Sequence, residues 1–307
     1  MIRNLSTPPC LKRVPTRDST IPGSDDFRRT IHRSSLVSVE NASVGGYSRM
    51  PSGYEPAHQI VLPYFGLFAY VVGRDRWLVD SNKVLFIAPG WEFSDEQPVA
   101  ALGHATVLIN PTRRLIDEIR CAMGIDGNDG LPFGTVRSSP WLQVVTQTLL
   151  RHSLAGADPL HGDELAVRAI SLALSGLPML GRASPAIVDR AKQFLHAHDC
   201  ERLSLEEVAA AVGVSPVYLT QEFKRSEGIP LYQYQLSLRL GRALMELPHA
   251  NDITLLALDL GFSSHSHFTL AFRKAFGMTP SEYRRSPLPA PMVPVYSSEA
   301  TALRVAA

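Results

Sequence analysis

Cysteine is scarce in this chain: among 307 residues there are three, Cys10, Cys121 and Cys200. They lie far apart and form no Cys-x-x-Cys pair, which argues against a zinc site built on paired cysteines and against dithiol redox chemistry. A small, odd number of cysteines is typical of proteins that work in a reducing cytoplasm. We therefore expect the protein to be cytoplasmic.

Long apolar runs are also missing. No stretch approaches the roughly 20 apolar residues that a helix needs to cross a bilayer, although hydrophobic residues make up 45% of the chain. The first residues hold Pro8, Pro9 and Pro15 among scattered arginines, and they lack the continuous apolar core of a signal peptide. We expect a soluble protein with no membrane partner, long enough for two domains.

An excess of positive charge, the usual mark of a DNA-binding domain, is absent. The formal net charge of the chain is +1, and residues 184–286 hold equal numbers of basic and acidic residues. Bulk charge therefore gives no support to a nucleic-acid partner. The placement of the charges gives some, because basic residues lie on or just beyond two similar helices of the C-terminal third. These residues are Lys224, Arg225, Arg239, Arg242, Arg273, Lys274, Arg284 and Arg285.

What the chain does contain is one pattern that occurs twice. Residues 208–215 and 256–263 share the pattern at an offset of 48 residues, and beyond the final serine the offset becomes 49. The pairs at the larger offset are Leu219 and Phe268, Phe223 and Phe272, Gly228 and Gly277, and Tyr234 and Tyr283. Such a repeat, with a single one-residue step in a turn, indicates two copies of one structural unit.

The first copy has the signals of a helix, a glycine turn and a second helix. Ser204 and Glu207 have the spacing of a capping box at the start of the first helix. Gly213 supplies the turn, because glycine adopts positive φ without steric cost. Ser215 then caps the second helix, and Pro216 occupies its first position.

The second copy repeats these signals with Asp252 as the first cap and Gly261 in the turn. A helix-turn-helix places its second helix in the major groove of DNA. Two ordinary helical hairpins are the plainer alternative. The doubling, the turn glycines and the spacing favour the DNA-binding interpretation.

Residues 187–285 resemble the DNA-binding domain of the AraC/XylS family of bacterial transcription regulators. The match is densest in Gly261-Phe262-Ser263-Ser264, Ser266, Phe268, Phe272-Arg273, Phe276-Gly277, Thr279-Pro280 and Tyr283-Arg284. Leu270 departs from the pattern, because arginine is frequent there, and this puts one polar contact in question. The resemblance implies a sequence-specific regulator that binds double-stranded DNA, forms a homodimer and, if it is an activator, contacts RNA polymerase.

Outward-facing residues near the start of each second helix are the candidates for DNA contacts. Leu219 and Phe223 face inward in the first copy, as Phe268 and Phe272 do in the second. Val217 suits a thymine methyl group, and Gln221 suits the two polar atoms of an adenine edge. The candidates for base contacts are Val217, Thr220, Gln221, His265, Ser266 and Thr269, and those for phosphate contacts are Lys224, Arg225, Arg273 and Lys274.

Residues 36–110 hold short apolar runs with many β-branched and aromatic residues, separated by Gly and Pro. Closely spaced short strands are typical of a sandwich or barrel. The turn Pro89-Gly90-Trp91-Glu92-Phe93 resembles the Pro-Gly turn of the cupin-like sensor domains in this regulator family. The interior of such a barrel can hold a small effector, or its aromatic residues can simply fill the core. The candidates for ligand contact are Tyr64, Trp77, Trp91 and Phe93.

Metal-binding and catalytic clusters are not apparent in the same region. Cupin enzymes hold a metal with a His-x-His pair, a glutamate and a later histidine. Here His58 stands alone, His104 follows 46 residues later, and Phe93 occupies a place where a histidine is expected. We therefore predict no catalytic residue, no metal, no cofactor and no enzyme.

Three functions stay open at this stage. The first is a regulator with a ligand-sensing barrel. The second is an effector-independent regulator whose N-terminal domain only dimerises or binds a protein. The third is a cupin enzyme with an appended helical domain.

The predicted fold class is α+β in two domains, with a cupin-like barrel followed by helices and then an all-α domain. Helices expected over 112–123, 139–153 and 163–177 either pack onto the barrel or form a dimer seam. A long helix over about 231–247 is expected to join the two helix-turn-helix motifs. The expected segments are a disordered arm (1–35), a sensor and dimerisation domain (36–180, with strands in 36–110 and helices in 111–180), a linker (181–186), the DNA-binding domain (187–286) and a disordered tail (287–307).

Overall fold

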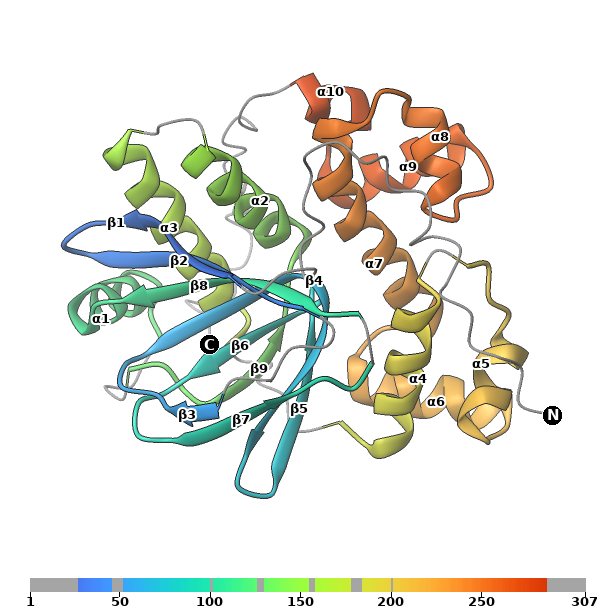
Figure 1. Cartoon of the computed structure of the whole chain (residues 1–307), viewed down its shortest axis with the longest axis horizontal. Coiled ribbons are helices and arrows are strands. Elements are labelled where there is room, and N and C mark those ends of the chain that lie inside the picture. Colours follow the sequence, from blue (N-terminus) through green and yellow to red (C-terminus); the bar gives the residue numbers. More distant parts are fainter. Residues whose placement is uncertain are drawn as a thin grey trace, which may run out of the picture.

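The computed structural model describes residues 27–45, 52–99, 102–125, 130–154, 158–177, 184–199 and 201–285. Within these residues an N-terminal region of strands and helices precedes a C-terminal region of helices alone, and the two regions pack side by side (Figure 1). The tail expected at 287–307 lies outside the described residues, as do residues 1–26 of the arm and 181–183 of the linker.

The strands of the N-terminal region form one strongly bent sheet around the long strand β4. The strands are β1 (Phe27–Arg33), β2 (Val37–Val44), β3 (Ser52–Tyr54), β4 (Gln59–Val72), β5 (Asp75–Asp80), β6 (Lys83–Ile87), β7 (Glu92–Glu96), β8 (His104–Pro111) and β9 (Gly134–Arg137). The order is β1-β2-β8-β4-β6-β9, and the second half of β4 pairs instead with β5 and β7.

The bend lies in the middle of β4. The register with β8 shifts between Pro63 and Phe65, which marks a β-bulge. Gly66 follows with φ +72°, and a Cβ atom there would overlap the Gly103 backbone. Only glycine fits this position, because both the positive φ and the close backbone approach exclude a side chain. The bend lets the two halves of the sheet face each other.

The sheet therefore has an inner and an outer face with separate cores. An inner cluster lies between the two halves: Val61, Phe68, Tyr70, Val72, Trp77, Val79, Leu85, Ile87 and Leu108, with Ala42, Phe93 and Phe133 against it. The larger outer cluster includes Ile60, Leu62, Phe86 and Ile109, which pack against helices. Alternation of side chains along each strand produces this division.

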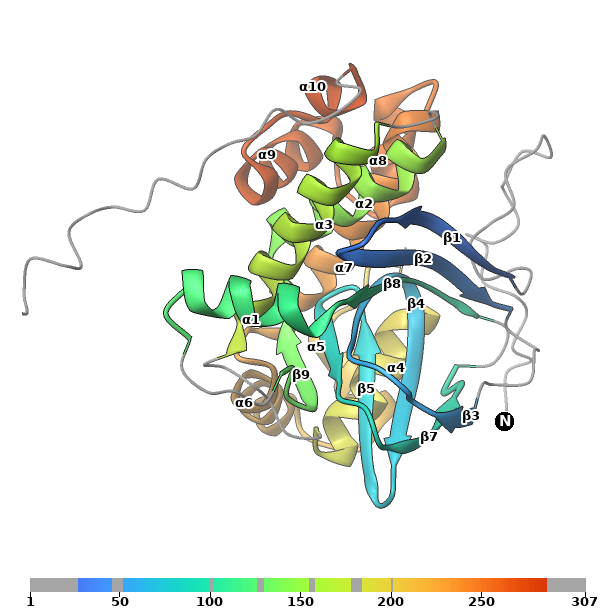
Figure 2. The ribbon, with the colours of Figure 1, turned by 90° about the vertical axis from the view of Figure 1, so that its left-hand side faces the viewer.

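Three helices cover the outer face, as Figure 2 shows. They are α1 (Arg113–Ala122), α2 (Pro140–Leu154) and α3 (Pro159–Leu174). Leu142 and Val145 of α2 and Ala166, Ala169 and Ile170 of α3 belong to the outer cluster. These apolar stripes thus pack onto the sheet, which is one of the two arrangements that the sequence left open.

The C-terminal region is built around the central helix α7 (Figure 1). Its helices are α4 (Ala186–Ala197), α5 (Leu205–Val212), α6 (Pro216–Glu227), α7 (Leu231–Glu246), η3 (Leu247–His249), α8 (Ile253–Asp259), α9 (His265–Phe276) and α10 (Pro280–Arg285). One core joins α4, α5 and α6 to the first half of α7, and a second core joins its other half to α8, α9 and α10.

Two expectations from the sequence are wrong. Strand β1 lies inside the segment expected to be disordered, because pairing with β2 and the Arg28–Glu40 ion pair order it. Strand β9 lies inside the segment expected to be helical, and it pairs with β6 at the edge of the sheet. Both strands depend on partners far away in the sequence, which local patterns do not reveal.

No helix in the described part of the chain is long and apolar enough to span a membrane.

Candidate nucleic-acid interface

The first helix pair, α5 and α6, has the capping that its sequence predicts. The Ser204 side chain accepts from the Glu207 backbone N–H at 3.2 Å, and the Glu207 carboxylate accepts from the Ser204 N–H at 2.7 Å. Gly213 ends α5 in the left-handed region with φ 74°. Ser215 accepts from the Tyr218 N–H at 3.2 Å and opens α6. Each such cap is worth about 1 kcal/mol.

The inner faces of α5 and α6 meet in a small core. Leu219 and Phe223 of α6 are fully buried against Val208 and Ala209 of α5. The ring of Phe223 also meets the ring of Tyr234 on α7 at 5.2 Å, edge to face. This packing fixes α6 relative to α7 and leaves the opposite face of α6 outward.

The second pair, α8 and α9, repeats the arrangement with one difference at the turn. Asp252 caps α8, and Gly261 turns with φ 80°. Ser264 caps α9, accepting from the His267 N–H at 3.1 Å, whereas Ser263 bonds the His267 ring at 3.0 Å. The cap equivalent to Ser215 is therefore Ser264, at the offset of 49, and the extra residue lies within the turn, before the cap.

The core of the second pair is aromatic. Phe268, Phe272 and Phe276 line the inner face of α9 and are fully buried. Neighbouring rings stand edge to face, with Phe272 and Phe276 at 4.6 Å. Phe262 and Tyr283 close the cluster from either side. Edge-to-face pairs add to the free energy of burial and define ring orientation, so this cluster fixes the inner face of α9.

Arginine side chains on α7 bind the segment between α4 and α5, and one of them also binds the turn of the second helix pair. Arg239 donates to the carbonyl oxygens of Gly261 at 3.1 Å and Glu201 at 2.6 Å. Arg242 pairs with Asp199 at 2.9 Å and with Glu246 on its own helix. The sequence suggested a place near DNA for both arginines, but their guanidinium groups bind other parts of the protein.

On α6 the predicted base-reading residues lie on the outward face. Val217 is 67% exposed, and Gln221 and Thr220 are exposed beside it. The Thr220 hydroxyl donates to the Pro216 carbonyl at 2.9 Å, which leaves its lone pairs for other contacts. Tyr218, half-exposed between them, was missed by the sequence reasoning. Its position next to a cap and an outward valine was the available signal.

On α9 the predicted residues are more mixed. Ser266 is exposed, whereas His265 and Thr269 are partly buried and lie within 3.3 Å of each other. Leu270 stands at the position equivalent to Gln221 and is 69% exposed. His267, also exposed, is held by Ser263. The outward face of α9 therefore carries an apolar side chain where α6 carries Gln221.

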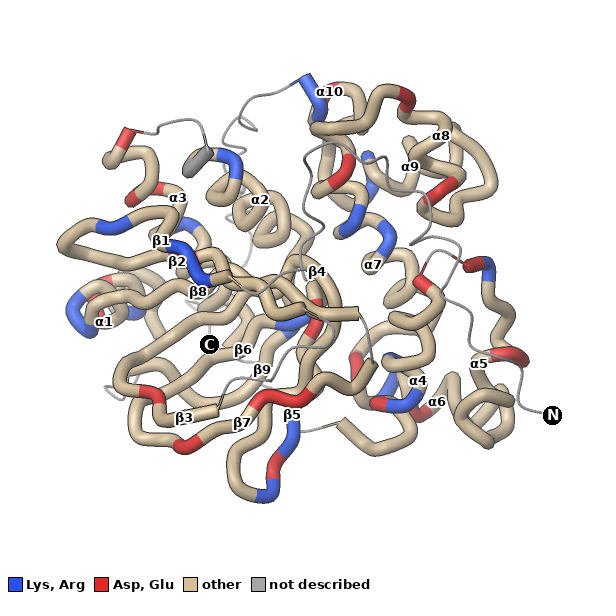
Figure 3. Tube along the Cα trace, in the orientation of Figure 1, with Lys and Arg blue, Asp and Glu red and all other residues tan. Residues whose placement is uncertain are grey.

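The predicted phosphate-binding residues project from the last turns of the two helices. Lys224, Arg273 and Lys274 are exposed and make no side-chain hydrogen bond or ion pair within the described residues. Arg225 differs, because Glu222 holds it at 2.6 and 2.8 Å and offsets its charge. Charges of both signs are interspersed over the C-terminal helices (Figure 3), so these three cations are separate contact points within a mixed surface.

Comparisons with known proteins point to one family. A family model described as a helix-turn-helix domain matches residues 208–286, which span both helix pairs. The transcriptional activator RhaS of Escherichia fergusonii is 26% identical over 83% of this chain and 96% of its own length. A Streptomyces antibioticus protein named as an AraC-like transcription regulator is 29% identical over 48% of each chain.

The chain belongs to the AraC family of transcription regulators. A solved Chromobacterium violaceum regulator with an AraC-type DNA-binding domain is 34% identical over 34% of this chain and 95% of its own, with a TM-score of 0.32.

A buried network of charges joins the DNA-binding region of this regulator to its sheet. Lys192 of α4 and Asp80 of β5 are both fully buried, with Nζ and Oδ2 3.3 Å apart. The Tyr234 hydroxyl donates to the same Asp80 oxygen at 2.5 Å. Glu227 at the end of α6 pairs with Lys83 of β6 at 2.9 Å. The first helix pair is thus fastened to the sheet.

Electrostatics keeps this network ionised. Burial raises the pKa of Asp80, but the Lys192 ammonium and hydrogen bonds from His196 and Tyr234 outweigh it and hold the pKa well below its usual range. Burial lowers the pKa of Lys192, but Asp80 and Glu227 raise it above its usual value. A depressed carboxyl pKa stabilises the fold above the ordinary carboxyl range and loses that effect only in strong acid. The connection therefore persists through the neutral range.

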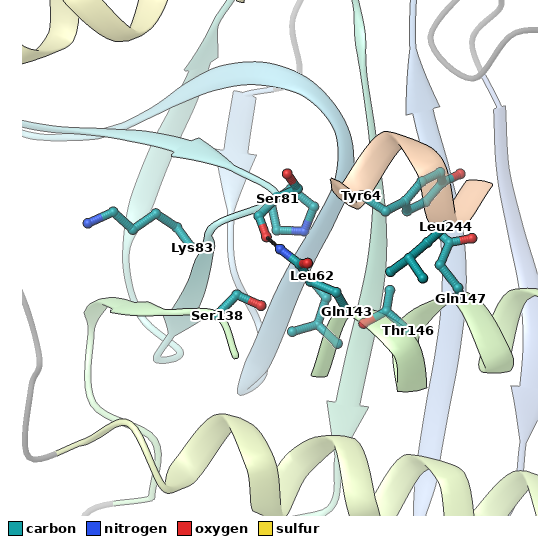
Figure 4. A pocket seen from close by; sticks show the side chains of 11 residues that line it. Leu62, Tyr64, Ser81, Lys83, Ser138, Gln143, Thr146, Gln147 and Leu244 are labelled. Carbon is teal, nitrogen blue, oxygen red and sulfur yellow. Dashed lines mark hydrogen bonds between the residues drawn. The ribbon is translucent and has the colours of Figure 1, made fainter. Parts of the chain in front are cut away.

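The second helix pair of the regulator is fastened by α2. Arg151 donates to the Tyr283 hydroxyl at 3.0 Å and lies over the Tyr283 ring at 4.7 Å. A small pocket at this junction is lined by residues of β4, α2 and α7, and it has room for about one water molecule. Figure 4 shows its polar end, where Gln143 donates to the Ser81 carbonyl at 2.7 Å.

Three of the four candidate effector residues come together on the inner face of the sheet. Trp77 is in edge-to-face contact with Phe133, with ring centroids 4.6 Å apart, and Trp91 stacks on the same Phe133 ring at 5.7 Å. Phe93 stacks on Tyr70 at 5.0 Å. We call Tyr70, Trp77, Trp91, Phe93 and Phe133 the aromatic cluster. Phe133 precedes β9, and nothing in its local sequence indicated this position.

The fourth candidate, Tyr64, lies elsewhere. It belongs to the outer cluster, and its hydroxyl donates to Asn41 at 2.8 Å. The bulge between Pro63 and Phe65 reverses the alternation of β4, so Tyr64 faces the helices while Phe68 and Tyr70 face inward. It lines the small junction pocket instead of the aromatic cluster.

Proposed function

We propose that this AraC-family protein is a bacterial, effector-controlled regulator in which both helix pairs are helix-turn-helix motifs. In this proposal α6 and α9 enter successive major-groove segments on one face of the DNA. The observation that supports it most directly is the repeat of cap, glycine turn and buried anchors in both pairs, each with an open outer face. Arg239 of α7 supports the arrangement, because it binds both the turn of the second pair at Gly261 and the segment that leads into the first pair at Glu201.

The two helices contribute differently to sequence recognition in this proposal. On α6, Gln221 offers both a donor and an acceptor, which suits adenine, and Val217 suits a thymine methyl group. On α9, Leu270 replaces the glutamine with an apolar contact, and Ser266 supplies the exposed hydroxyl. We therefore propose that α6 is the more selective of the two.

We further propose that the bent sheet is a cupin-like barrel and that a small effector binds at its aromatic cluster. Strand β5 supports a route from that site to DNA. Trp77 and Val79 lie on its inner face, whereas Asp80 and the Leu78 carbonyl bind Lys192 of α4 on the outer side. A ligand that binds one arrangement of β5 more tightly would shift the position of α4, because only differential affinity moves such an equilibrium.

A regulator without an effector is the second candidate. Mutual contacts among the aromatic rings favour it, because they are also what a filled core shows. In that case the N-terminal region would serve dimerisation or protein binding. A homodimer is part of our proposal in both cases, as is contact with RNA polymerase if the protein, like the relative named as an activator, activates transcription.

The substitution Trp91→Ala separates these candidates. Trp91 is 46% exposed, so its removal costs little core packing. We expect the variant to lose induction in a reporter strain, under a condition found by screening small molecules against the wild type, while the purified protein keeps its basal DNA binding. Tyr54→Ala is the matched control, because Tyr54 is an exposed aromatic residue on the neighbouring strand β3. A folded Trp91→Ala protein that is still fully inducible would contradict the proposal.

A further inference from the structure

Three neighbouring strands place a row of polar and aromatic side chains beside the aromatic cluster. Tyr70 on β4 pairs with Trp77 on β5 and, on its other side, with Asp95 on β7. Cross-strand partners share a face of the sheet, so these three side chains lie together. Phe93 and Gln97, two residues before and after Asp95, share that face by alternation.

Glu55 joins the same group. Its backbone N–H donates to the Trp91 carbonyl at 3.1 Å, and its carbonyl accepts from the Gly90 N–H at 3.0 Å, which extends the β3–β7 pairing. Glu55 therefore lies opposite Trp91. Trp91 precedes Asp95 by four residues on the same stretch of chain. Burial raises the pKa of the Tyr70 hydroxyl most, and the nearby carboxylates of Glu55 and Asp95 raise it further.

Several polar atoms of this group are covered but make no hydrogen bond within the described residues. They are Tyr70 Oη, Trp77 Nε1, Asp95 Oδ1 and both amide atoms of Gln97. Tyr70 is 3% exposed and Trp77 is 8% exposed. Other buried tyrosine hydroxyls of this chain are paired: Tyr64 with Asn41, Tyr234 with Asp80 and Tyr283 with the Leu244 carbonyl. A covered polar group without a partner costs free energy, so a ligand bound here would gain from polar contacts with this group.

The charges of the group favour a cation. Burial, and then the nearby Glu55 carboxylate, raises the pKa of Asp95 to about 8, and no cation among the described residues offsets this effect. Burial raises the pKa of Glu55, and the charge of Arg28 offsets only part of that increase. The Arg28 guanidinium is bound to the Glu40 carboxylate at 2.6 Å and lies largely in solvent.

We propose that the aromatic cluster, with Asp95 and Glu55, binds an organic cation, namely an amine or quaternary ammonium that also carries a hydrogen-bond acceptor. This proposal rests on the effector function proposed above and names the chemical class of that effector. The ammonium group lies against the ring faces, where the ring quadrupole attracts it. The two carboxylates balance its charge, and the Trp77 N–H donates to its acceptor.

Choline and its neutral carbon isostere 3,3-dimethyl-1-butanol test the proposal on the full-length protein. Both have one hydroxyl group, and they differ mainly in charge. Calorimetry and the fluorescence of Trp77 and Trp91 report binding. We expect choline to bind at least about tenfold more tightly than the alcohol, which corresponds to about 1.4 kcal/mol.

The pH dependence of choline binding gives a second readout. A raised carboxyl pKa means that Asp95 is mostly protonated below about pH 8 and ionised above it. Choline does not titrate, so its affinity should rise about tenfold from pH 6 to pH 8.5 as Asp95 ionises. The stability of the ligand-free protein should change in the opposite direction. The folded state keeps the Asp95 proton to a higher pH than the unfolded state does, so Asp95 makes the protein less stable as pH rises from about 4 to 8.

The variant Asp95→Asn tests whether ionisation of Asp95 causes this pH dependence of choline binding. Glu55 and Tyr70 also belong to the site. Arg28, which is paired with Glu40, acts on Glu55 from outside it, and His104 stacks on Phe68 of the inner cluster. Asp95→Asn should therefore remove the pH dependence and weaken choline about tenfold at pH 8.5. Glu92→Gln, an exposed change on the same strand, should alter neither.

The outcomes separate the ligand class from the effector function. Equal binding of choline and the alcohol, or an unchanged pH profile in Asp95→Asn, would overturn the cation proposal. Absence of binding by both choline and benzyltrimethylammonium would overturn it too. If D-glucose, a neutral polyol, binds instead and perturbs the Trp91 signal, the class is wrong and the effector function stands. If nothing binds and Trp91→Ala remains inducible, the effector function fails as well.

Discussion

At the scale of single residues, the arginines of the C-terminal region divide by what their guanidinium groups bind. Arg239 and Arg202 donate to the backbone carbonyls of Gly261 and Phe262 in the turn of the second helix pair. Arg225 is neutralised by Glu222 on its own helix. Arg273 projects outward. The equal numbers of acidic and basic residues in this region therefore do not describe its surface. Several basic side chains are bound within the protein, and a few remain for a partner.

Two substitutions test the division between base-reading and phosphate-binding residues. Gln221→Ala should weaken binding to the preferred site by about 1–3 kcal/mol and relax the preference at one base pair. The reason is that the amide side chain alone offers a donor and an acceptor at that point. Binding of the purified variant to a library of single-base operator variants measures the change.

Arg273→Ala should weaken binding to all sequences alike and reduce the salt dependence by about one counterion. Titrations at several salt concentrations measure the slope. Arg225→Ala is the matched control: its charge is already offset by Glu222, so its loss should change the slope less. An altered sequence preference in Arg273→Ala would show that this residue reads bases.

At the scale of elements, helices in this chain are determined locally and strands are not. The caps Ser204, Ser215 and Asp252 and the turn glycines Gly213 and Gly261 lie where the sequence predicts them. Each signal acts within four residues, so it can be recognised without the fold.

The sheet was harder to predict, for a definite physical reason. Alternation predicts that Tyr64, Phe68 and Tyr70 share one face of β4, but the bulge after Pro63 puts Tyr64 on the other. Strand β9 is four residues long and forms only through β6. The paired row of Tyr70, Trp77 and Asp95 likewise depends on register. Part of the proposed effector site was therefore beyond what periodicity alone predicts.

The register of the second turn gives a sharp test at this scale. Ser264→Ala removes the cap of α9 and should destabilise the protein by about 1 kcal/mol. Ser263→Ala removes only the contact with the exposed His267 ring, so it should be close to neutral. Urea unfolding of both variants compares them. If Ser263→Ala destabilised the protein more than Ser264→Ala did, Ser263 would be the cap equivalent to Ser215.

At the scale of the whole molecule, buried charges connect the two regions. Lys192 lies between Asp80 of the sheet and Glu227 of α6, and all three side chains are buried. Buried ion pairs contribute little net stability, but losing one partner is costly because the other charge stays buried. This property suits a contact that must hold one relative position of two regions.

Asp80→Ala should therefore destabilise the full-length protein by about 3 kcal/mol. The loss arises because Lys192 keeps its burial without its nearest carboxylate, and Tyr234 loses its acceptor. The double variant Asp80→Ala with Lys192→Met should recover much of the loss, since no unpaired charge remains. Urea unfolding measures both. A single variant within about 1 kcal/mol of the wild type would show that solvent reaches this network.

DNA footprinting of the purified full-length protein on its own operator tests the central claim most directly. The proposed arrangement of α6 and α9 predicts two short protected blocks per monomer on one face of the duplex. They should be separated by about one helical turn, roughly 34 Å. Gln221→Ala should weaken protection in one block before the other. A single protected block per monomer, unaffected by changes on α9, would contradict the account.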